Sequence, residues 1–339
     1  MSLDLLLKIS IGLLPVLVFL GALLYLDSYK LVKLHLIARV ILAGALTAVL
    51  AYFANGYAID ALNMEFMDYT RYVSPIIEEF LKGLVVVYLF RSNRIGFLVD
   101  SAIMGFAVGA GFALVENLYY LYHATNTHIA VWIVRGFGTA VMHGGVTAIF
   151  SVLAQMLTER QTKANYLLFV PGLLAAAVLH SIFNQFPVSP ILSTVATLVV
   201  IPMILMLVFR KSVSLMHDWL EVDFDANEEL LANIQSGNFT HSKAGRFLLD
   251  LRDRFDGMIV ADMLCYIRFH VELAIRAKSM LMAREFGMDV KMDDEIKAKF
   301  EELHTLEQNI GKAGFLAMRP YLHMSRKDLW QLFLLEEQK

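Results

Sequence analysis

The sequence predicts an all-α fold: a polytopic membrane bundle of about seven transmembrane helices, followed by a helical cytosolic domain. The first reason is composition, because 58% of the 339 residues are hydrophobic, whereas soluble domains contain roughly 45–50%. The second reason is the distribution of charge. Residues 1–210 hold only 12 of the 29 Lys and Arg residues and 10 of the 32 Asp and Glu residues. We therefore expect a transmembrane domain at 1–210 and a soluble domain at 211–339.

A helix needs roughly 20 apolar residues to cross the hydrocarbon core of a bilayer. Stretches that approach this length lie at 3–25, 34–54, 75–90, 97–122, 137–157, 165–186 and 190–209. We expect the first to be a retained anchor, because it has little positive n-region and no clear cleavage site. The glycine-containing segment 135–138 suggests a break, so we expect 128–135 to be a separate interfacial segment before the fifth helix.

The connections between these helices alternate in charge. One set carries nine basic residues, and the opposite set carries only Arg71 and Arg135. Because cytoplasmic loops are enriched in Lys and Arg, we expect the N-terminus outside the cell and the C-terminal domain in the cytosol. The net charge of −3 argues against a nucleic-acid partner. The single cysteine, Cys265, excludes an intramolecular disulfide and a cysteine-cluster zinc site.

Ionisable residues inside the apolar stretches are the strongest functional signal. A charge at mid-span costs at least ~2.5–3.5 kcal/mol, so such residues are functional candidates by default. Each has a structural alternative: an acid at a helix N-terminus, an interfacial acid, a hydrogen-bonded core histidine, or an interhelical polar pair. Counting 1.5 Å per residue places Glu78, Glu116, His143 and His180 in one layer, roughly 5–9 Å below the outer surface. The candidates are Glu78, Glu79, Lys82, Glu116, His143, His180 and Asn184.

Three of these residues are suitable zinc ligands. Glu116, His143 and His180 provide one carboxylate and two imidazoles, and three protein ligands with an open fourth position are the arrangement of catalytic zinc. The sequence contains no HExxH motif, so the common zincin helix is excluded. The ligands would come from three different helices, as in metal sites inside helix bundles.

The remaining candidates suit the accompanying proton and charge chemistry. Glu78 or Glu79 is expected to act as the general base that takes the proton of the attacking water. Asn184 is expected to donate a hydrogen bond to the developing oxyanion. Lys82 lies four residues after Glu78 and would hold the glutamate pair.

At these residues the sequence resembles the PrsW family of intramembrane proteases, which belongs to the superfamily of the CAAX prenyl proteases. The matching segments are 78–82, 112–117, His143 and 180–184, and the resemblance covers about 70–190. It implies a glutamate-activated water and a metal-linked site within the bilayer. It also implies proteolysis of a membrane-anchored substrate, such as an anti-sigma factor, in the bacterial cytoplasmic membrane. On this basis residues 1–210 are expected to form the protease-like domain.

Two other classes of function remain open from the residues alone. Carboxylates and histidines at one depth also describe a proton or divalent-metal transporter, although no polar ladder continues through the inner halves of the helices. A membrane anchor that presents residues 211–339 as a scaffold is the other class, but it leaves the buried ionisable residues unexplained.

The C-terminal domain is expected to be a small helical bundle whose role the sequence does not indicate. Its longest helix has an apolar stripe that includes Met263, Ile267 and Val271, typical of a bundle core. Trp330 on the last helix could anchor a contact in a homo-oligomer. The expected helices are 226–236, 242–255, 257–286, 292–309 and 325–337.

Overall fold

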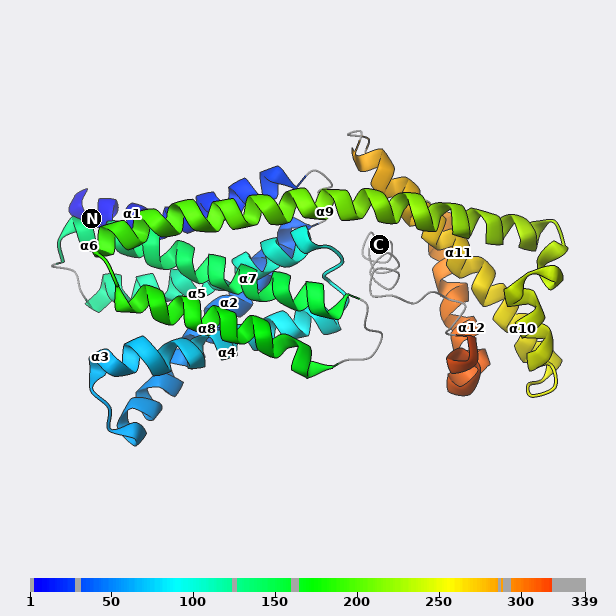
Figure 1. Cartoon of the computed structure of the whole chain (residues 1–339), viewed down its shortest axis with the longest axis horizontal. Coiled ribbons are helices and arrows are strands. Elements are labelled where there is room, and N and C mark those ends of the chain that lie inside the picture. The colour runs from blue at the N-terminus through cyan, green and yellow to red at the C-terminus, as the bar shows by residue number, and fades with distance from the viewer. Residues whose placement is uncertain are drawn as a thin grey trace. The chain divides into compact units, whose positions relative to one another are not determined.

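The protein is helical throughout the residues that the computed structural model describes, which are 3–27, 32–123, 127–159, 165–285, 288 and 294–318 (Figure 1). No strand occurs among these residues, which confirms the predicted all-α class. The chain divides into two compact units, one extending to Ser212 and the other beginning at Val213. The expected helix at 325–337, with Trp330, lies outside the described residues.

The first unit is a bundle of long helices joined by short helical turns. Six helical segments of the described chain are long and apolar enough to cross a membrane. The long helices are α1 (Leu3–Leu26), α2 (Leu34–Leu62), α4 (Ser74–Arg91), α5 (Leu98–His123), α7 (Ala140–Thr158), α8 (Val170–Gln185) and the part of α9 (Pro190–Gln235) that ends at Ser212. The short turns are α3 (Phe66–Asp68), the π-helix η1 (Tyr69–Val73), α6 (Ile129–Ile133), the π-helix η2 (Val134–Thr139) and the 3-10 helix η3 (Tyr166–Phe169).

The third predicted span, 75–90, is present as α4, but it is not among the six apolar segments. This helix has only 18 residues, and four of them are charged, namely Glu78, Glu79, Lys82 and Arg91. The helix that carries most candidate site residues is therefore the least suited of the long helices to face lipid.

The centre of this unit is formed by α5 and α7. The apolar part of α5 is 89% buried and that of α6–α7 is 78% buried, against 22% for α1. Gly109 allows the close approach, because a Cβ there would lie 2.1 Å from the carbonyl oxygen of His143. Gly111 faces the other way, where a Cβ would lie 2.0 Å from the carbonyl oxygen of Ile41 on α2. These contacts confirm that the glycines serve close helix packing.

The prediction of a separate segment at 128–135 was wrong. The chain runs from α6 through η2 into α7 as one helical segment, Ile129–Thr158. Gly136 does not break the helix; instead a Cβ at this position would lie 1.8 Å from the carbonyl oxygen of Ile11 on α1. The glycine pair is thus explained by packing between helices, and the irregularity is absorbed by a π-helical turn.

The second unit is a set of helices with its own buried core. The expected helix at 226–236 is not separate, because α9 continues without interruption to Gln235. Met263, Ile267 and Val271 are buried, as the stripe on the longest helix predicted. The remaining elements are the 3-10 helix η4 (Asn238–His241), α10 (Lys243–Leu251), α11 (Gly257–Glu285) and α12 (Asp294–Met318), the last kinked at Gly311.

Candidate active site

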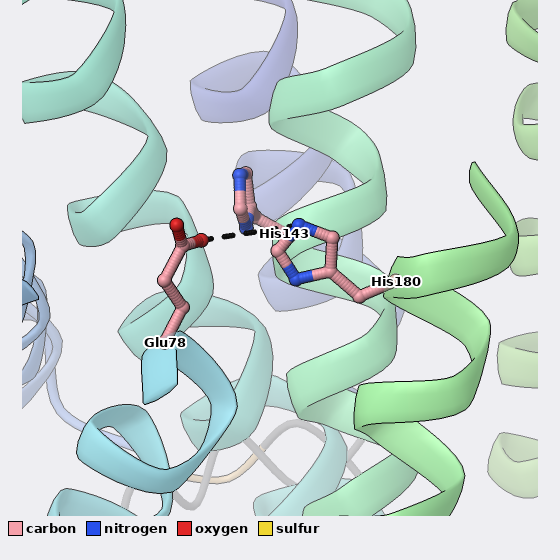
Figure 2. A group of neighbouring side chains, drawn as sticks. All are labelled: Glu78, His143 and His180. Carbon is pink, nitrogen blue, oxygen red and sulfur yellow. Dashed lines mark ion pairs between the residues drawn. The ribbon is translucent and has the colours of Figure 1, made fainter. Parts of the chain in front are cut away.

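Three helices bring one carboxylate and two imidazoles together inside the first unit (Figure 2). Glu78 comes from α4, His143 from α7 and His180 from α8, and one ligand atom of each lies within 4.8 Å of the others. Both histidines are buried, with exposed fractions of 1% and 2%. Among the described residues, this is the one group of histidine, cysteine and acidic side chains with the geometry to hold a metal ion.

Glu78 is positioned through one of its two oxygens. Its Oε1 accepts a hydrogen bond of 2.6 Å from Ser74 Oγ and one of 3.3 Å from Asn55 Nδ2 on α2. Tyr69 supports this contact, because its hydroxyl donates to Asn55 Oδ1 at 2.9 Å. The other oxygen, Oε2, lies 3.8 Å from His180 Nε2. The carboxylate is therefore held on one side and free on the other.

Glu79, the next residue, has the opposite environment. Its Oε1 accepts from Lys82 Nζ at 2.5 Å and lies 2.8 Å from His180 Nδ1. Its Oε2 accepts from Thr147 Oγ1 at 3.4 Å. The side chains of Glu79 and Lys82 are completely buried. Both carboxylate oxygens are thus engaged and shielded from water.

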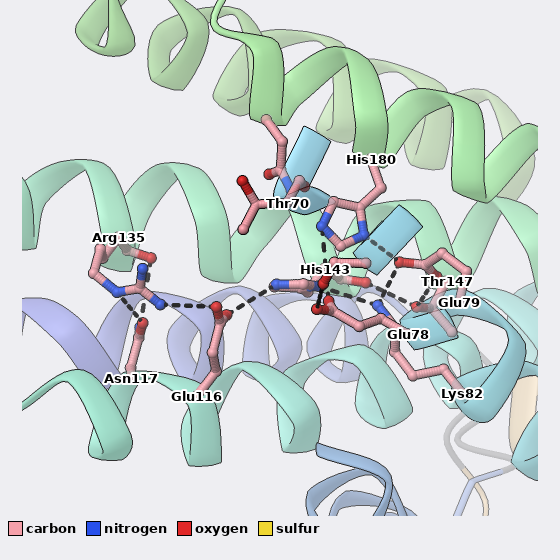
Figure 3. A network of polar contacts seen from close by, with 12 residues as sticks. Thr70, Glu78, Glu79, Lys82, Glu116, Asn117, Arg135, His143, Thr147 and His180 are labelled. Carbon is pink, nitrogen blue, oxygen red and sulfur yellow. Dashed lines mark hydrogen bonds and ion pairs between the residues drawn. The ribbon is translucent and has the colours of Figure 1, made fainter. Parts of the chain in front are cut away.

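Glu116 holds the second histidine and is itself held by an arginine (Figure 3). Its Oε2 lies 3.0 Å from His143 Nε2, and its Oε1 lies 3.2 Å from the guanidinium of Arg135. Arg135 also donates through Nε to Asn117 Oδ1 at 2.9 Å, and Asn117 donates to the carbonyl oxygen of Gly12 at 2.7 Å. This chain of contacts connects α1, α5, η2 and α7.

The hydrogen bonds determine which imidazole nitrogens carry lone pairs. The ammonium of Lys82 lies 3.1 Å from His143 Nδ1, and an ammonium can only donate. In neutral His143 the proton is therefore on Nε2 and is donated to Glu116. In neutral His180 the proton is on Nδ1 and is donated to Glu79, so Nε2 carries the lone pair. That lone pair faces Glu78 Oε2 across 3.8 Å, a distance too long for a hydrogen bond.

This donor arrangement fits a divalent cation. One nitrogen of His143, one nitrogen of His180 and one carboxylate oxygen of Glu78 lie within 4.8 Å of one another, and imidazole nitrogen and carboxylate oxygen are ordinary zinc ligands. The opposite nitrogen of each histidine donates to a carboxylate, which is the usual support of a metal-binding histidine. In the structure the Lys82 ammonium provides the positive charge next to His143 Nδ1.

Asn184 is not part of this group of three possible metal ligands. Its side-chain amide donates to the carbonyl oxygen of Thr70 at 3.0 Å, one turn beyond His180 on the same helix. The neighbouring hydroxyl of Ser181 donates to the carbonyl oxygen of Arg71. Both contacts fasten α8 to the π-helix η1. The oxyanion role of Asn184 stays a prediction.

The sequence analysis missed several residues that support the site. Asn55 lies just beyond the predicted end of the second span, at 54, and was not considered. Arg135 was counted as a loop charge, although it lies within the continuous α6–α7 segment. Polar side chains at the ends of apolar stretches were the available signal. The other supporting residues that were not predicted are Tyr69, Asn117 and Thr147.

A cavity of about 870 Å³ reaches the candidate site. Glu78 and Glu116 line it, together with residues of α2, α5 and η1. Glu79, His143 and His180 are not part of its lining. Of the two glutamates predicted as the base, only Glu78 borders this cavity.

The comparison with protein families decides the class of this protein. The family model for PrsW family intramembrane metalloproteases matches residues 33–209, more than half of the chain. The chain belongs to the PrsW family. A search of curated proteins and a search of solved structures found no match.

Membership in the PrsW family confirms the resemblance and identifies the protein as a multi-pass membrane protease. The matched region contains every residue of the cluster described above, whereas α1 and the helices α10 to α12 lie outside it. Because the matched family consists of metalloproteases, the metalloprotease interpretation replaces the transporter and scaffold interpretations.

Proposed function

We propose that the protein is a zinc-dependent endopeptidase that hydrolyses a peptide bond of a membrane-anchored protein, and that Glu78, His143 and His180 hold the zinc. The observation that carries this proposal is that one ligand atom each from Glu78 on α4, His143 on α7 and His180 on α8 lies within 4.8 Å of the others. Two imidazoles and one carboxylate are a known ligand set of catalytic zinc in proteases. Bound zinc supplies a Lewis acid that polarises the scissile carbonyl.

This ligand set replaces Glu116 of the sequence-based set with Glu78. Glu116 accepts the Nε2 proton of His143, so it contacts the nitrogen opposite to the one that faces the cluster. Its second oxygen is paired with Arg135. Glu116 and Glu79 therefore have matching roles, since each fixes the orientation of one imidazole.

The formal charges around the site favour a cation. Glu78, Glu79 and Glu116 contribute three negative charges, and Lys82 and Arg135 contribute two positive charges. With both imidazoles neutral the sum is −1. Inside a low-dielectric bundle this negative sum favours the binding of a cation over that of an anion.

A second assignment of Glu78 is favoured by its hydrogen bonds. Ser74 and Asn55 occupy Oε1, so Oε2 is the free oxygen and faces the cluster, as a general base requires. In that case Glu78 Oε2 takes the proton of the attacking water, and Glu116 is the third ligand, as the sequence suggested. Glu79 is unsuited to this role because both its oxygens are engaged.

The proposed site is tested by elemental analysis of purified wild type beside His143→Ala and His180→Ala. We expect about one zinc per chain in wild type, as in single-ion catalytic sites, and its loss in both variants. His35→Ala is the matched control, because His35 is exposed on α2 and is not in the cluster. Absence of metal in folded wild type, or full retention in both variants, would refute the proposal.

The cellular arrangement is a further part of this proposal: a bacterial cytoplasmic membrane, with the N-terminus outside and the C-terminal unit in the cytosol. Cys265 provides the test, because it is the single cysteine of the chain and is exposed on α11. A membrane-impermeant maleimide should label Cys265 only after the cytosolic side is opened. In a Cys265→Ser background, Asn63→Cys, in the turn after α2, should be labelled from outside. The reverse pattern would invert the orientation.

A further inference from the structure

The helices α2 and α5 touch at one level and separate beyond it. At the contact, a Cβ on Gly44 would lie 2.0 Å from the carbonyl oxygen of Val108, and Gly111 approaches Ile41 just as closely. Further along, Ala48 and Ala51 pack with Phe112, and then Tyr52 and Tyr119 make contact with ring centroids 5.4 Å apart. Figure 1 shows the end of α2 and α3 extending away from the other helices of this unit. The separation leaves a space that leads to the site.

This space is the cavity of about 870 Å³, which we call the α2–α5 cavity. Its outer part is aromatic and open: Tyr57 is 79% exposed and Phe66 is 64% exposed. Its inner part is polar, because Asn55, Ser74 and Glu78 line it there and bond to one another. The cavity therefore changes from apolar at its rim to polar at the candidate catalytic carboxylate.

A peptide segment suits this change of polarity better than a lipid chain does. An acyl chain has no polar group to place against Asn55 and Glu78, and burying polar groups without partners is unfavourable. A peptide offers amide groups for the inner end and apolar side chains for the aromatic part. Aromatic walls favour large apolar and aromatic side chains.

We propose that the α2–α5 cavity is the substrate-binding site, and that it takes an extended segment of the membrane-anchored substrate with a large apolar or aromatic side chain beside the scissile bond. This rests on the proposed peptidase function. The partner is thus defined by chemistry: a single-span protein that is unwound near the outer surface and has Leu, Phe, Tyr or Trp at the cleaved bond.

Gly56 provides a direct test, because it lines the cavity and a Cβ at this position meets nothing within 4 Å. Gly56→Phe therefore adds a bulky ring to the lining of the cavity without a clash at its Cβ. Gly21 on α1 is the matched control, since it is also an exposed helical glycine with open space around it and does not line the cavity. Full-length protein in liposomes is given a library of biotinylated single-span peptides, and mass spectrometry identifies the residues at each cleaved bond.

Wild type and Gly21→Phe should cleave mainly beside large apolar residues. Gly56→Phe should lower the ratio of cleavage beside Phe and Trp to cleavage beside Ala by about tenfold or more, the range expected when a pocket loses space for a few methylenes. Zinc content should be unchanged. An unchanged cleavage profile in Gly56→Phe would overturn the cavity proposal while leaving the peptidase intact. Loss of a co-purified phospholipid with an unchanged profile would assign the cavity to lipid instead.

A binding experiment separates this proposal from the peptidase. Benzoylphenylalanine is placed at Gly56 or at Gly21, and the same peptides are crosslinked by light. Crosslinks at position 56 and not at 21, enriched in peptides with large apolar residues, support the cavity even if no peptide is cleaved. Equal crosslinking at both positions, or none at 56, overturns it even if cleavage occurs.

Discussion

Glu78→Gln is the substitution that tests the site most directly. It changes one oxygen to an amide nitrogen and keeps the shape of the side chain. Ser74 and Asn55 can still donate to the remaining Oε1, so the new NH₂ takes the place of Oε2. It then faces His180 Nε2, which was 3.8 Å from Oε2. We expect the fold to change in stability by about 1 kcal/mol or less, because the hydrogen bonds of Oε1 persist.

The effect on the site should be much larger than the effect on the fold. The substitution places an uncharged NH₂ group opposite the lone pair of His180 Nε2 and removes an anionic ligand at the same time. Loss of support from one outer partner alone weakens metal binding by about 10–100-fold, and loss of a ligand should exceed that. Loss of a proton acceptor lowers turnover by about 10²–10⁴-fold. We therefore expect loss of zinc and of cleavage in a folded protein.

The assay compares zinc content, thermal unfolding in detergent and peptide cleavage for wild type, Glu78→Gln and Glu79→Gln. Glu79→Gln is a matched control, because it makes the same chemical change at the neighbouring residue. It leaves the Lys82 ammonium completely buried without a charged partner at 2.5 Å, which should destabilise the fold by about 3–5 kcal/mol. Only the first variant should lose activity without losing stability.

Two results would change the assignment. Turnover at the wild-type rate in Glu78→Gln would refute both proposed roles of Glu78. Lost turnover with full zinc content would show that Glu78 is the base, and the third ligand would then be Glu116.

Three further predictions concern the supports of the site and the second unit. Arg135→Gln removes the charge next to Glu116 but changes no proposed zinc ligand. It should lower the affinity for zinc, measured by equilibrium dialysis, about 10–100-fold. An unchanged affinity would contradict this prediction. Gly109→Ala should lower the stability of the bundle by about 1–3 kcal/mol, because a Cβ would overlap the His143 carbonyl, whereas Gly56→Ala, in open space, should not shift the melting temperature. Partial burial raises the pKa of Glu272 on α11, but hydrogen bonds from Arg268 and from Lys299 on α12 outweigh it and lower the pKa below 4.5. Its stabilising effect is therefore present above pH 4.5 and is lost as the pH falls through the lowered value. The hydrogen-exchange protection factors of α11 and α12, which are corrected for the intrinsic pH dependence of amide exchange, should fall over this pH range in wild type and fall less in Glu272→Gln.

The fold was largely predictable because the period and length of apolar stretches carry the information. Six of the seven predicted spans correspond to helices that are long and apolar enough to cross a membrane. The boundary errors have one cause: local signals were treated as chain breaks. Gly136 suggested a loop but serves close packing against α1, and the charges after Arg210 suggested a new helix although α9 continues to Gln235.

The candidate site residues could be named from the sequence, but their pairings could not. An ionisable residue in an apolar helix stands out by its cost, which identified Glu78, His143 and His180. Which carboxylate faces which imidazole depends on the rotation of each helix about its axis. That rotation is changed near the site by the π-helices η1 and η2, which a regular 3.6-residue period does not predict. For the same reason the support from Asn55 was not expected.

The three glutamates of the candidate site differ in which cation each is paired with, and this difference supports the separate roles that we propose for them. Glu79 is neutralised by Lys82 and Glu116 by Arg135, so each can hold an imidazole without leaving a buried charge. Among the described residues, Glu78 has no lysine or arginine within ion-pair distance, and its partners are neutral donors. It is also the acid of the Glu78–Glu79 pair that borders the α2–α5 cavity. The uncompensated charge thus lies where the substrate and the metal would meet. The two paired carboxylates, Glu79 and Glu116, each contact an imidazole, so the arrangement fits the proposed division between one reactive carboxylate and two that orient the histidines.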